Sequence, residues 1–331
     1  MKKQFGAGLV IAAAIGLGCA HAAPDTVDSH VLAAQKAAGL DFPGTLARVC
    51  VQPAGGNDAN ASARATRAAA PRPEVVPDRA TWYAEPMKVF DNLYWVGTKI
   101  HSSWAIKTNA GIILIDTLYN YAAEPEIVEG LKKLGLDPAT IKYVIVTHGH
   151  GDHDEGAKLL QDKFGTHVIM GAPDWDSIIK ANNMPGGVPK RDMVATDGEK
   201  LTLGDETVTI ILTPGHTPGT LSMIFPVKDN GKTIMVAYSG GTAFNFPRDP
   251  AHFETYIASA KKFQAAAKAA GATILLSNHS EFDEAYMKGR MLASRKPGEA
   301  SPFVVGADAV QRYFTVTSEC AEAAKLRLKG S

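Results

Sequence analysis

Apolar residues in the middle of the chain fall into short runs that are broken by turn residues and by one stretch of helical periodicity. Runs of this length, rich in β-branched and aromatic residues, are typical of strands. The pattern predicts strands at 87–97, 104–108 and 111–117, a helix at 124–135, and a strand at 142–147.

The second half of the chain repeats this alternation. Phe253, Tyr256, Ile257, Ala260 and Phe263 recur at helical spacing and predict one long helix. We interpret the aromatic and methionine residues of these segments as core. Strands are expected at 167–171, 208–213, 221–225, 233–238 and 273–277, with a hairpin turn at 228–232. The chain is therefore expected to be an α/β protein in which helices cover sheets.

The N-terminus has the three parts of a secretory signal peptide. Lys2 and Lys3 precede an apolar stretch at 5–17, and the small-residue sequence AHA follows at 20–22. We expect cleavage after Ala22 and a periplasmic or secreted protein. The alternatives are a membrane anchor, for which the apolar stretch is shorter than the roughly 20 residues of a span, and a lipoprotein.

The mature chain begins with a segment of different composition. Residues 24–50 are expected to form a short helix that ends in a loop. Residues 53–80 are rich in Ala, Pro, Gly and Asn and indicate a linker or surface segment. We therefore divide the chain into a signal peptide (1–22), an N-terminal extension with a linker (23–80) and one main domain (81–331).

The charge and length of the chain limit the classes of function that we expect. The chain has 331 residues, 45% of them hydrophobic, and its 34 basic residues balance its 34 acidic ones. Nucleic-acid binding usually requires a basic excess, so we expect no nucleic-acid partner. A small-molecule substrate and no membrane span are expected, and the sequence does not predict the oligomeric state.

Two cysteines remain after removal of the signal peptide, Cys50 and Cys320. Disulfides form and persist in exported proteins, so we expect these two to pair. The alternative is two unrelated buried thiols, because the sequence does not show how close the two residues come.

Three histidines and an aspartate follow the strand expected at 142–147. His148 and His150 are two residues apart and project the same way, while Asp152 and His153 come round the turn before a helix. Imidazole and carboxylate are ligands that zinc prefers. The alternative is a solvated polar turn, but each buried imidazole would then need another partner. We interpret the cluster as a metal site.

The pattern His-x-His-x-Asp-His resembles the signature of the metallo-β-lactamase superfamily, and the resemblance covers about residues 87–325. The family adds two later histidines, matched here by His216 in TPGHTPG and His279 in LLSNHSEFD. The resemblance implies an αββα four-layer sandwich with two zinc ions. It assigns His148, His150 and His216 to the first zinc, and Asp152, His153 and His279 to the second.

This ligand set is similar to that of the third subclass of class B β-lactamases. Other branches, such as glyoxalase II and many lactonases, use a bridging aspartate after the strand that corresponds to 233–238. Ser239 and Gly240 occupy that place here. The resemblance therefore implies that only water or hydroxide bridges the two metals, and that a zinc-bound hydroxide attacks the substrate.

Catalytic roles follow from the same resemblance. Two zinc ions lower the pKa of a shared water from about 15.7 to near 7, and Asp152 would both ligate zinc and orient the hydroxide. Asp116 and Thr147 are expected to support the ligands, because the family's aspartate at that place braces the histidine loop. The alternative for Asp116 is an ordinary turn-initiating residue.

The loop YSGGTAFNF at 238–246 departs from the YADSL common in the subclass. We interpret His101, Trp104, Phe244 and Asn245 as packing or surface residues, with a place in the lining of the cleft as the alternative, and we assign His167 and His252 no role. The resemblance also places Ala272 where a cysteine often pairs with the C-terminal helix, a link that Cys50 would replace. We expect β-lactam hydrolysis, with two alternatives: hydrolysis of another ester, lactone or amide, and a non-catalytic periplasmic zinc-binding protein.

Overall fold

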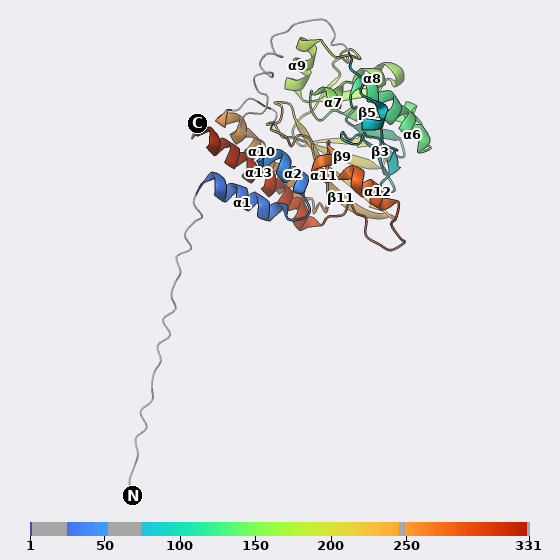
Figure 1. The fold of residues 1–331 in the computed structure, drawn as a ribbon. Coiled ribbons are helices and arrows are strands. Elements are labelled where there is room, and N and C mark those ends of the chain that lie inside the picture. The colour runs from blue at the N-terminus through green and yellow to red at the C-terminus, as the bar shows by residue number, and fades with distance from the viewer. Residues whose placement is uncertain (2–24, 52–73, 245, 247–248, 330–331) are drawn as a thin grey trace.

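The computed structural model describes residues 1, 25–51, 74–244, 246 and 249–329. The signal peptide apart from Met1, most of the expected linker and Asn245 lie outside the described residues. The structure is built around two β-sheets with helices on their outer faces (Figure 1).

The first sheet has seven strands in the order of the sequence. β1 to β4 pair antiparallel, whereas β4, β5, β6 and β7 pair in parallel. The single strand expected at 87–97 is two short strands joined by a turn. The strands are β1 (Met87–Lys88), β2 (Leu93–Trp95), β3 (Trp104–Thr108), β4 (Gly111–Ile115), β5 (Ile141–Ile145), β6 (His167–Met170) and β7 (Met193–Val194).

The second sheet has five strands in the order β12-β11-β10-β9-β8. The expected hairpin is confirmed: β10 and β11 pair antiparallel, and Asn230 and Gly231 between them both have positive φ, as a two-residue hairpin turn requires. β11 and β12 pair in parallel. The strands are β8 (Glu199–Leu203), β9 (Glu206–Leu212), β10 (Leu221–Asp229), β11 (Lys232–Ser239) and β12 (Ile274–Ser277).

The main hydrophobic core lies between the two sheets. Trp95, Trp104 and Ile145 of the first sheet are fully buried with Phe225 and Tyr238 of the second. Burying a side chain of this size contributes about 1.5–3 kcal/mol relative to leaving it exposed. This core fixes the two sheets against each other and therefore fixes the loops at their edges.

Helices cover the outer face of the first sheet. Their apolar side chains, including Ile127, Leu131 and Trp175, pack against that sheet in a separate cluster. The helix expected at 124–135 begins earlier, at Asn120, and a π-helix in which Glu126 is buried follows this first α-helical turn. These elements are α5 (Asn120–Ala122), η1 (Ala123–Val128), α6 (Glu129–Lys133), η2 (Pro138–Thr140), α7 (Gly151–Asp154), α8 (Ala157–Phe164) and α9 (Ala172–Ala181).

A second helical layer covers the outer face of the second sheet, where α1 lies along α13 (Figure 1). The segment expected to be one helix and a loop is two helices, because Pro43 starts a second one at its N-terminus. The elements of this layer are α1 (Val27–Ala38), α2 (Pro43–Cys50), α10 (Pro250–Ala269) and α13 (Ala307–Lys329). The other short helices of the described residues are α4 (Arg79–Trp82), α11 (Ser280–Asp283) and α12 (Ala285–Leu292).

The disulfide between Cys50 and Cys320 is present and joins α2 to α13. The expected αββα arrangement is confirmed. The division of the chain at residue 81 stays a prediction, although α1 and α2 share a core with α13. Among the described residues, no helix is long and apolar enough to cross a membrane.

Candidate metal centre

The predicted site residues follow strand ends that meet at one edge of the two sheets. His148, His150, Asp152 and His153 follow β5, His216 follows β9, and His279 follows β12. β4 and β5 are parallel, as are β11 and β12, so their carboxyl ends lie together. A hydrogen bond from Leu221 N to Thr147 O (2.8 Å) joins the loops of the two sheets.

His148, His150 and His216 form the first cluster. His216 Nε2 lies 3.0 Å from His148 Nε2 and 3.1 Å from His150 Nδ1. His148 and His216 are buried, and His150 is half-buried. Burial lowers the pKa of all three imidazoles, that of His216 to about 3. The three rings are therefore neutral at pH 7, the form in which imidazole binds a metal.

Two backbone carbonyls fix the tautomers of this cluster. His148 Nδ1 donates to Gly240 O (2.9 Å), and His216 Nδ1 donates to Ala243 O (2.6 Å). A neutral imidazole carries one proton, so both Nε2 atoms present lone pairs, and they do so 3.0 Å apart. Two lone pairs at this distance repel unless a cation lies between them. The donor set therefore fits a divalent metal ion.

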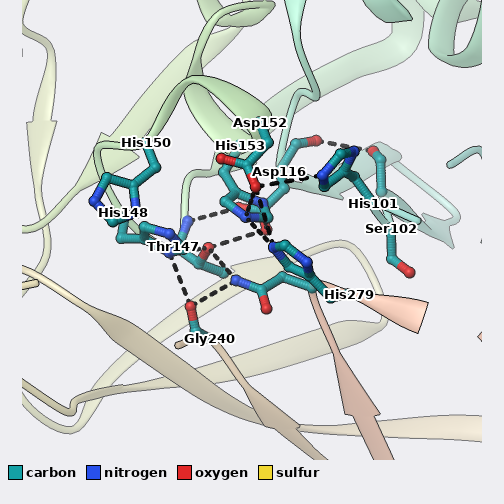
Figure 2. A network of polar contacts seen from close by, with 12 residues as sticks. His101, Ser102, Asp116, Thr147, His148, His150, Asp152, His153, Gly240 and His279 are labelled. Carbon is teal, nitrogen blue, oxygen red and sulfur yellow. Dashed lines mark hydrogen bonds and ion pairs between the residues drawn. The ribbon is translucent and has the colours of Figure 1, made fainter. Parts of the chain in front are cut away.

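Asp152, His153 and His279 form the second cluster (Figure 2). Asp152 Oδ2 lies 3.1 Å from His153 Nε2 and 3.1 Å from His279 Nε2, and the two Nε2 atoms are 3.1 Å apart. Ligands bound tetrahedrally at about 2.0–2.1 Å lie roughly 3.3–3.4 Å from one another. The spacing of these three atoms thus fits a shared metal ion.

Charge distinguishes the second cluster from the first. Burial opposes ionisation of Asp152, but His153 and His279 hold the pKa of its carboxyl well below the usual range. Burial also opposes protonation of His153, yet Asp152 and Asp116 raise its pKa to about 10. Without a metal, the site therefore favours a positive charge at His153, and a bound divalent ion would replace that proton.

Asp116 connects the ligand loop to the end of β4. Its Oδ1 accepts from Thr147 N (2.7 Å), and its Oδ2 accepts from Thr147 Oγ1 (3.0 Å). The same Oδ2 lies 3.1 Å from His153 Nδ1, an electrostatic contact whose angle is not that of a regular hydrogen bond. Asp116 has φ 61°, a conformation unusual outside glycine. The contacts fit the supporting role expected for Asp116 and Thr147.

Asp174 on α9 is a supporting residue that sequence reasoning missed. It is buried, and it accepts from Gly149 N (2.9 Å), Thr217 Oγ1 (2.6 Å) and Gly219 N (2.9 Å). Burial raises the pKa of its carboxyl despite these bonds. One carboxylate thus ties the loop of His150 to the loop of His216, and no local sequence pattern indicates it.

The remaining candidates divide between the core, the surface and the site. Trp104 is in the core, and the ring of Phe244 contacts those of Phe253 and Tyr256, as packing residues do. His167 is exposed and lies beside Asp192, and His252 is half-buried and lies beside Asp249. His101, which we interpreted as a packing or surface residue, instead faces the second cluster, with Nε2 3.5 Å from Asp152 Oδ2.

Ser239 ends β11, and Gly240 and Gly241 follow it, at the place where the bridging aspartate was expected to be missing. Gly240 has no room for a side chain, because a Cβ there would lie 1.7 Å from Leu221 O. A Cβ at Gly241 would lie 2.6 Å from His216 Cβ, so Gly241 is the position whose side chain would face the ligands. Among the described residues, the candidate metal groups are His148, His150 and His216, and His101, Asp152 and His279. His153 joins the latter by the distances above.

The chain is similar to known metallo-beta-lactamases in structure and to hydroxyacylglutathione hydrolases in sequence. Residues 96–233 match the family model of the metallo-beta-lactamase superfamily. BJP-1, a subclass B3 metallo-beta-lactamase of Bradyrhizobium japonicum, has a TM-score of 0.59 and 28% identity, over 73% of this chain and 94% of its own. FEZ-1, the metallo-beta-lactamase from Legionella gormanii, has a TM-score of 0.64 and 26% identity, over 75% of this chain and 96% of its own.

Curated relatives are similar over a shorter part of the chain. The hydroxyacylglutathione hydrolase of Chelativorans sp. (strain BNC1) is 30% identical over 111 residues, 34% of this chain and 38% of the relative. That of Synechocystis sp. (strain PCC 6803) is 28% identical over 151 residues, 44% of this chain and 54% of the relative. The chain thus matches about half of these relatives or less. With the fold and the family model, the comparisons show that the chain contains a metallo-beta-lactamase superfamily domain, matched over residues 96–233.

Proposed function

We propose that this protein is an exported dizinc hydrolase that opens β-lactam rings. The observation that carries the proposal is the composition of the two clusters: three neutral histidines in one and Asp152 with histidines in the other, with no carboxylate shared between them among the described residues. Gly241, whose side chain would face His216, supplies no bridging group. The similarity to the subclass B3 enzymes BJP-1 and FEZ-1 supports the same conclusion.

Each of the two clusters would hold one metal ion. His148, His150 and His216 would hold the first ion, and Asp152, His153 and His279 the second. A pair of bound zinc ions supplies Lewis acidity and a nucleophile derived from water at neutral pH. The chain holds its donors in fixed tautomers through Gly240 O and Ala243 O, so little reorganisation accompanies metal binding.

The protein also determines from which side a substrate arrives. His148, His153 and His216 are buried, whereas His150, Asp152 and His279 are half-buried. The substrate would therefore approach across these three residues and place its carbonyl between the clusters. Asp152 contacts His153 and His279 through Oδ2 and is the acidic group positioned to accept a proton or orient the attacking solvent.

Hydrolysis of a hydroxyacylglutathione thioester is the second candidate. It is favoured by the sequence matches to hydroxyacylglutathione hydrolases over 111 and 151 residues. Against it stand Ser239, Gly240 and Gly241, because the resemblance assigns that branch a bridging aspartate after this strand and none of the three residues carries a carboxylate. The two candidates share the fold and the metal ligands, so only substrate turnover separates them.

The test compares substrates on one metal-loaded preparation. We expect turnover of a chromogenic cephalosporin and a carbapenem that exceeds turnover of a hydroxyacylglutathione thioester, about two zinc ions per chain, and no turnover after chelation. Asp152→Asn should be inactive on every substrate, while His167→Gln, at an exposed histidine remote from both clusters, should match the unmodified protein. Thioester cleavage without β-lactam opening would replace the first candidate by the second.

Export is tested separately. The proposal rests on the basic, apolar and small-residue pattern of the N-terminus and on the disulfide between Cys50 and Cys320. Expression of the full chain in a Gram-negative host should yield periplasmic protein whose first residue is Ala23. Protein that keeps its N-terminus and stays in the cytoplasm would contradict it.

A further inference from the structure

His101 lies in the loop between β2 and β3, and hydrogen bonds attach this loop to the segment of His279. Ser280 N donates to Ile100 O (2.7 Å), and Ser102 N donates to Asn278 O (2.9 Å). His101 and His279 themselves form an antiparallel bridge. The backbone of His101 is therefore fixed relative to a residue of the second cluster.

The ring of His101 is directed at that cluster (Figure 2). Its Nε2 lies 3.5 Å from Asp152 Oδ2, and its centroid lies 4.9 Å from that of His279, edge to face. The other side of the ring packs against Tyr119, with centroids 5.2 Å apart. The side chain is only 15% exposed, so burial and packing limit its freedom to turn away.

The distance from His101 Nε2 to Asp152 Oδ2 distinguishes a metal ligand from a residue that supports Asp152 by a hydrogen bond. An N–H···O hydrogen bond has its atoms about 2.7–3.2 Å apart, so at 3.5 Å His101 makes no regular hydrogen bond to this carboxylate. Two ligands of one tetrahedral ion, bound at about 2.0–2.1 Å, lie roughly 3.3–3.4 Å apart. His101, Asp152 and His279 each offer one ligand atom within 4.8 Å of the others. The spacing therefore fits a shared ion better than a supporting contact.

We propose that His101 is a fourth protein ligand of the second metal ion, beside Asp152, His153 and His279. The inference rests on the proposed dimetal function, in which the second site has three protein ligands. A fourth protein ligand would raise the affinity of the second site for its ion, whereas three ligands leave more of the coordination sphere to solvent. The second ion would then be held more tightly than the first.

The charges agree with this difference in affinity. The first cluster consists of histidines alone, whereas Asp152 and Asp116 both lie beside the second. Two carboxylates balance the two positive charges of a divalent ion. The charge of the second ion would thus be neutralised by these carboxylates.

Direct ligation is tested by nuclear magnetic resonance on the full protein, with histidine labelled by ¹⁵N and the metals replaced by ¹¹³Cd. Only a nitrogen bonded to cadmium shows a one-bond coupling. With two ions bound we expect six coupled histidines, His101 among them. Five coupled histidines with two ions bound would overturn the inference and leave the proposed function intact. A protein that binds one ion contradicts the dimetal function, and a split His101 resonance then still decides the inference.

A variant supplies an independent measurement. His101→Phe keeps a ring against Tyr119 but removes the ligand atom. Loss of an outer supporting partner costs about 10–100-fold in metal affinity, so we expect loss of a ligand to lower the affinity for one of the two ions by more than about 100-fold in chelator competition. His167→Phe is the matched control, because the ring of His167 also contacts a tyrosine ring, that of Tyr143, and lies beside an aspartate, but at the surface.

A fall of about 100-fold or less in His101→Phe would overturn the ligand role. If this variant does not fold, as judged by circular dichroism, the count of coupled histidines in the unmodified protein decides the question.

Discussion

Replacing Asp116 with asparagine is expected to weaken binding of the second metal ion while the loop keeps its shape. Asparagine has the same size and tolerates the φ of 61° that Asp116 adopts. Its Oδ1 can still accept from Thr147 N, the 2.7 Å bond that holds the ligand loop to β4. The substitution therefore changes only the charge and the second oxygen.

The magnitude follows from what that second oxygen contacts. Asp116 Oδ2 accepts from Thr147 Oγ1 at 3.0 Å and lies 3.1 Å from His153 Nδ1. An asparagine NH₂ at this place would face the imidazole N–H, donor against donor, and would lose the attraction to the ion. Loss of such a supporting partner costs about 10–100-fold in metal affinity, which corresponds to about 1.4–2.7 kcal/mol. We expect a loss of this size for one ion and none for the other.

Chelator competition that resolves the two binding events is the assay, with circular dichroism to confirm the fold. Asp192→Asn is the matched control, since Asp192 Oδ2 lies 2.9 Å from Nδ1 of the exposed His167 and is remote from both clusters. Unchanged affinities in Asp116→Asn, or an equal loss at both ions, would refute the assignment of Asp116 to the second site.

Further predictions concern the other ion, the disulfide and a buried carboxyl group. Gly241→Asp should displace His216, because the new Cβ would lie 2.6 Å from His216 Cβ. We expect metal analysis of this variant to find about one ion fewer per chain. Full metal content would contradict the prediction. Replacing Cys50 and Cys320 by alanine should lower the free energy of unfolding, measured in urea, by about 2–4 kcal/mol. This is less than the chain-entropy value of about 5–6 kcal/mol for a separation of 270 residues. An unchanged unfolding midpoint would argue against the bridge. Burial raises the pKa of Glu126 to about 8 from 4.5, so the folded state binds its proton more tightly than the unfolded state. Stability should then fall between about pH 4.5 and 8 by up to about 1.4 kcal/mol per unit, and Glu126→Gln should remove this slope; parallel pH profiles would exclude the effect.

The strands and the ligand loop could be predicted because their signals are local. The short apolar runs gave most strands, and Asn230-Gly231 gave the hairpin. The motif at 148–153 places four donors within six residues, so it indicates a metal site without knowledge of the fold. Helix α2 was not predicted, because Pro43 and Gly44 favour a loop locally and the helix is held by its packing and disulfide with α13.

His101 and Asp174 could not be predicted because their roles depend on contacts between distant segments. His101 precedes β3, and β3 pairs antiparallel with β4, so the start of β3 lies at the same edge as Asp116. A single histidine in a polar loop gives no sign of this. Asp174 is one acidic residue in an amphipathic helix, and only the approach of Gly149, Thr217 and Gly219 gives it partners.

The two clusters differ in what holds them, and this difference bears on substrate choice. Backbone carbonyls orient His148 and His216 of the first, whereas a buried carboxylate supports His153 of the second. Both carbonyls, Gly240 O and Ala243 O, belong to the loop after β11. A change in that loop would therefore alter the first metal site as well as any substrate contact, so the departure of its sequence from YADSL affects both at once. Exchange of this loop for that of a subclass B3 enzyme should accordingly change the affinity for the first ion together with the substrate preference.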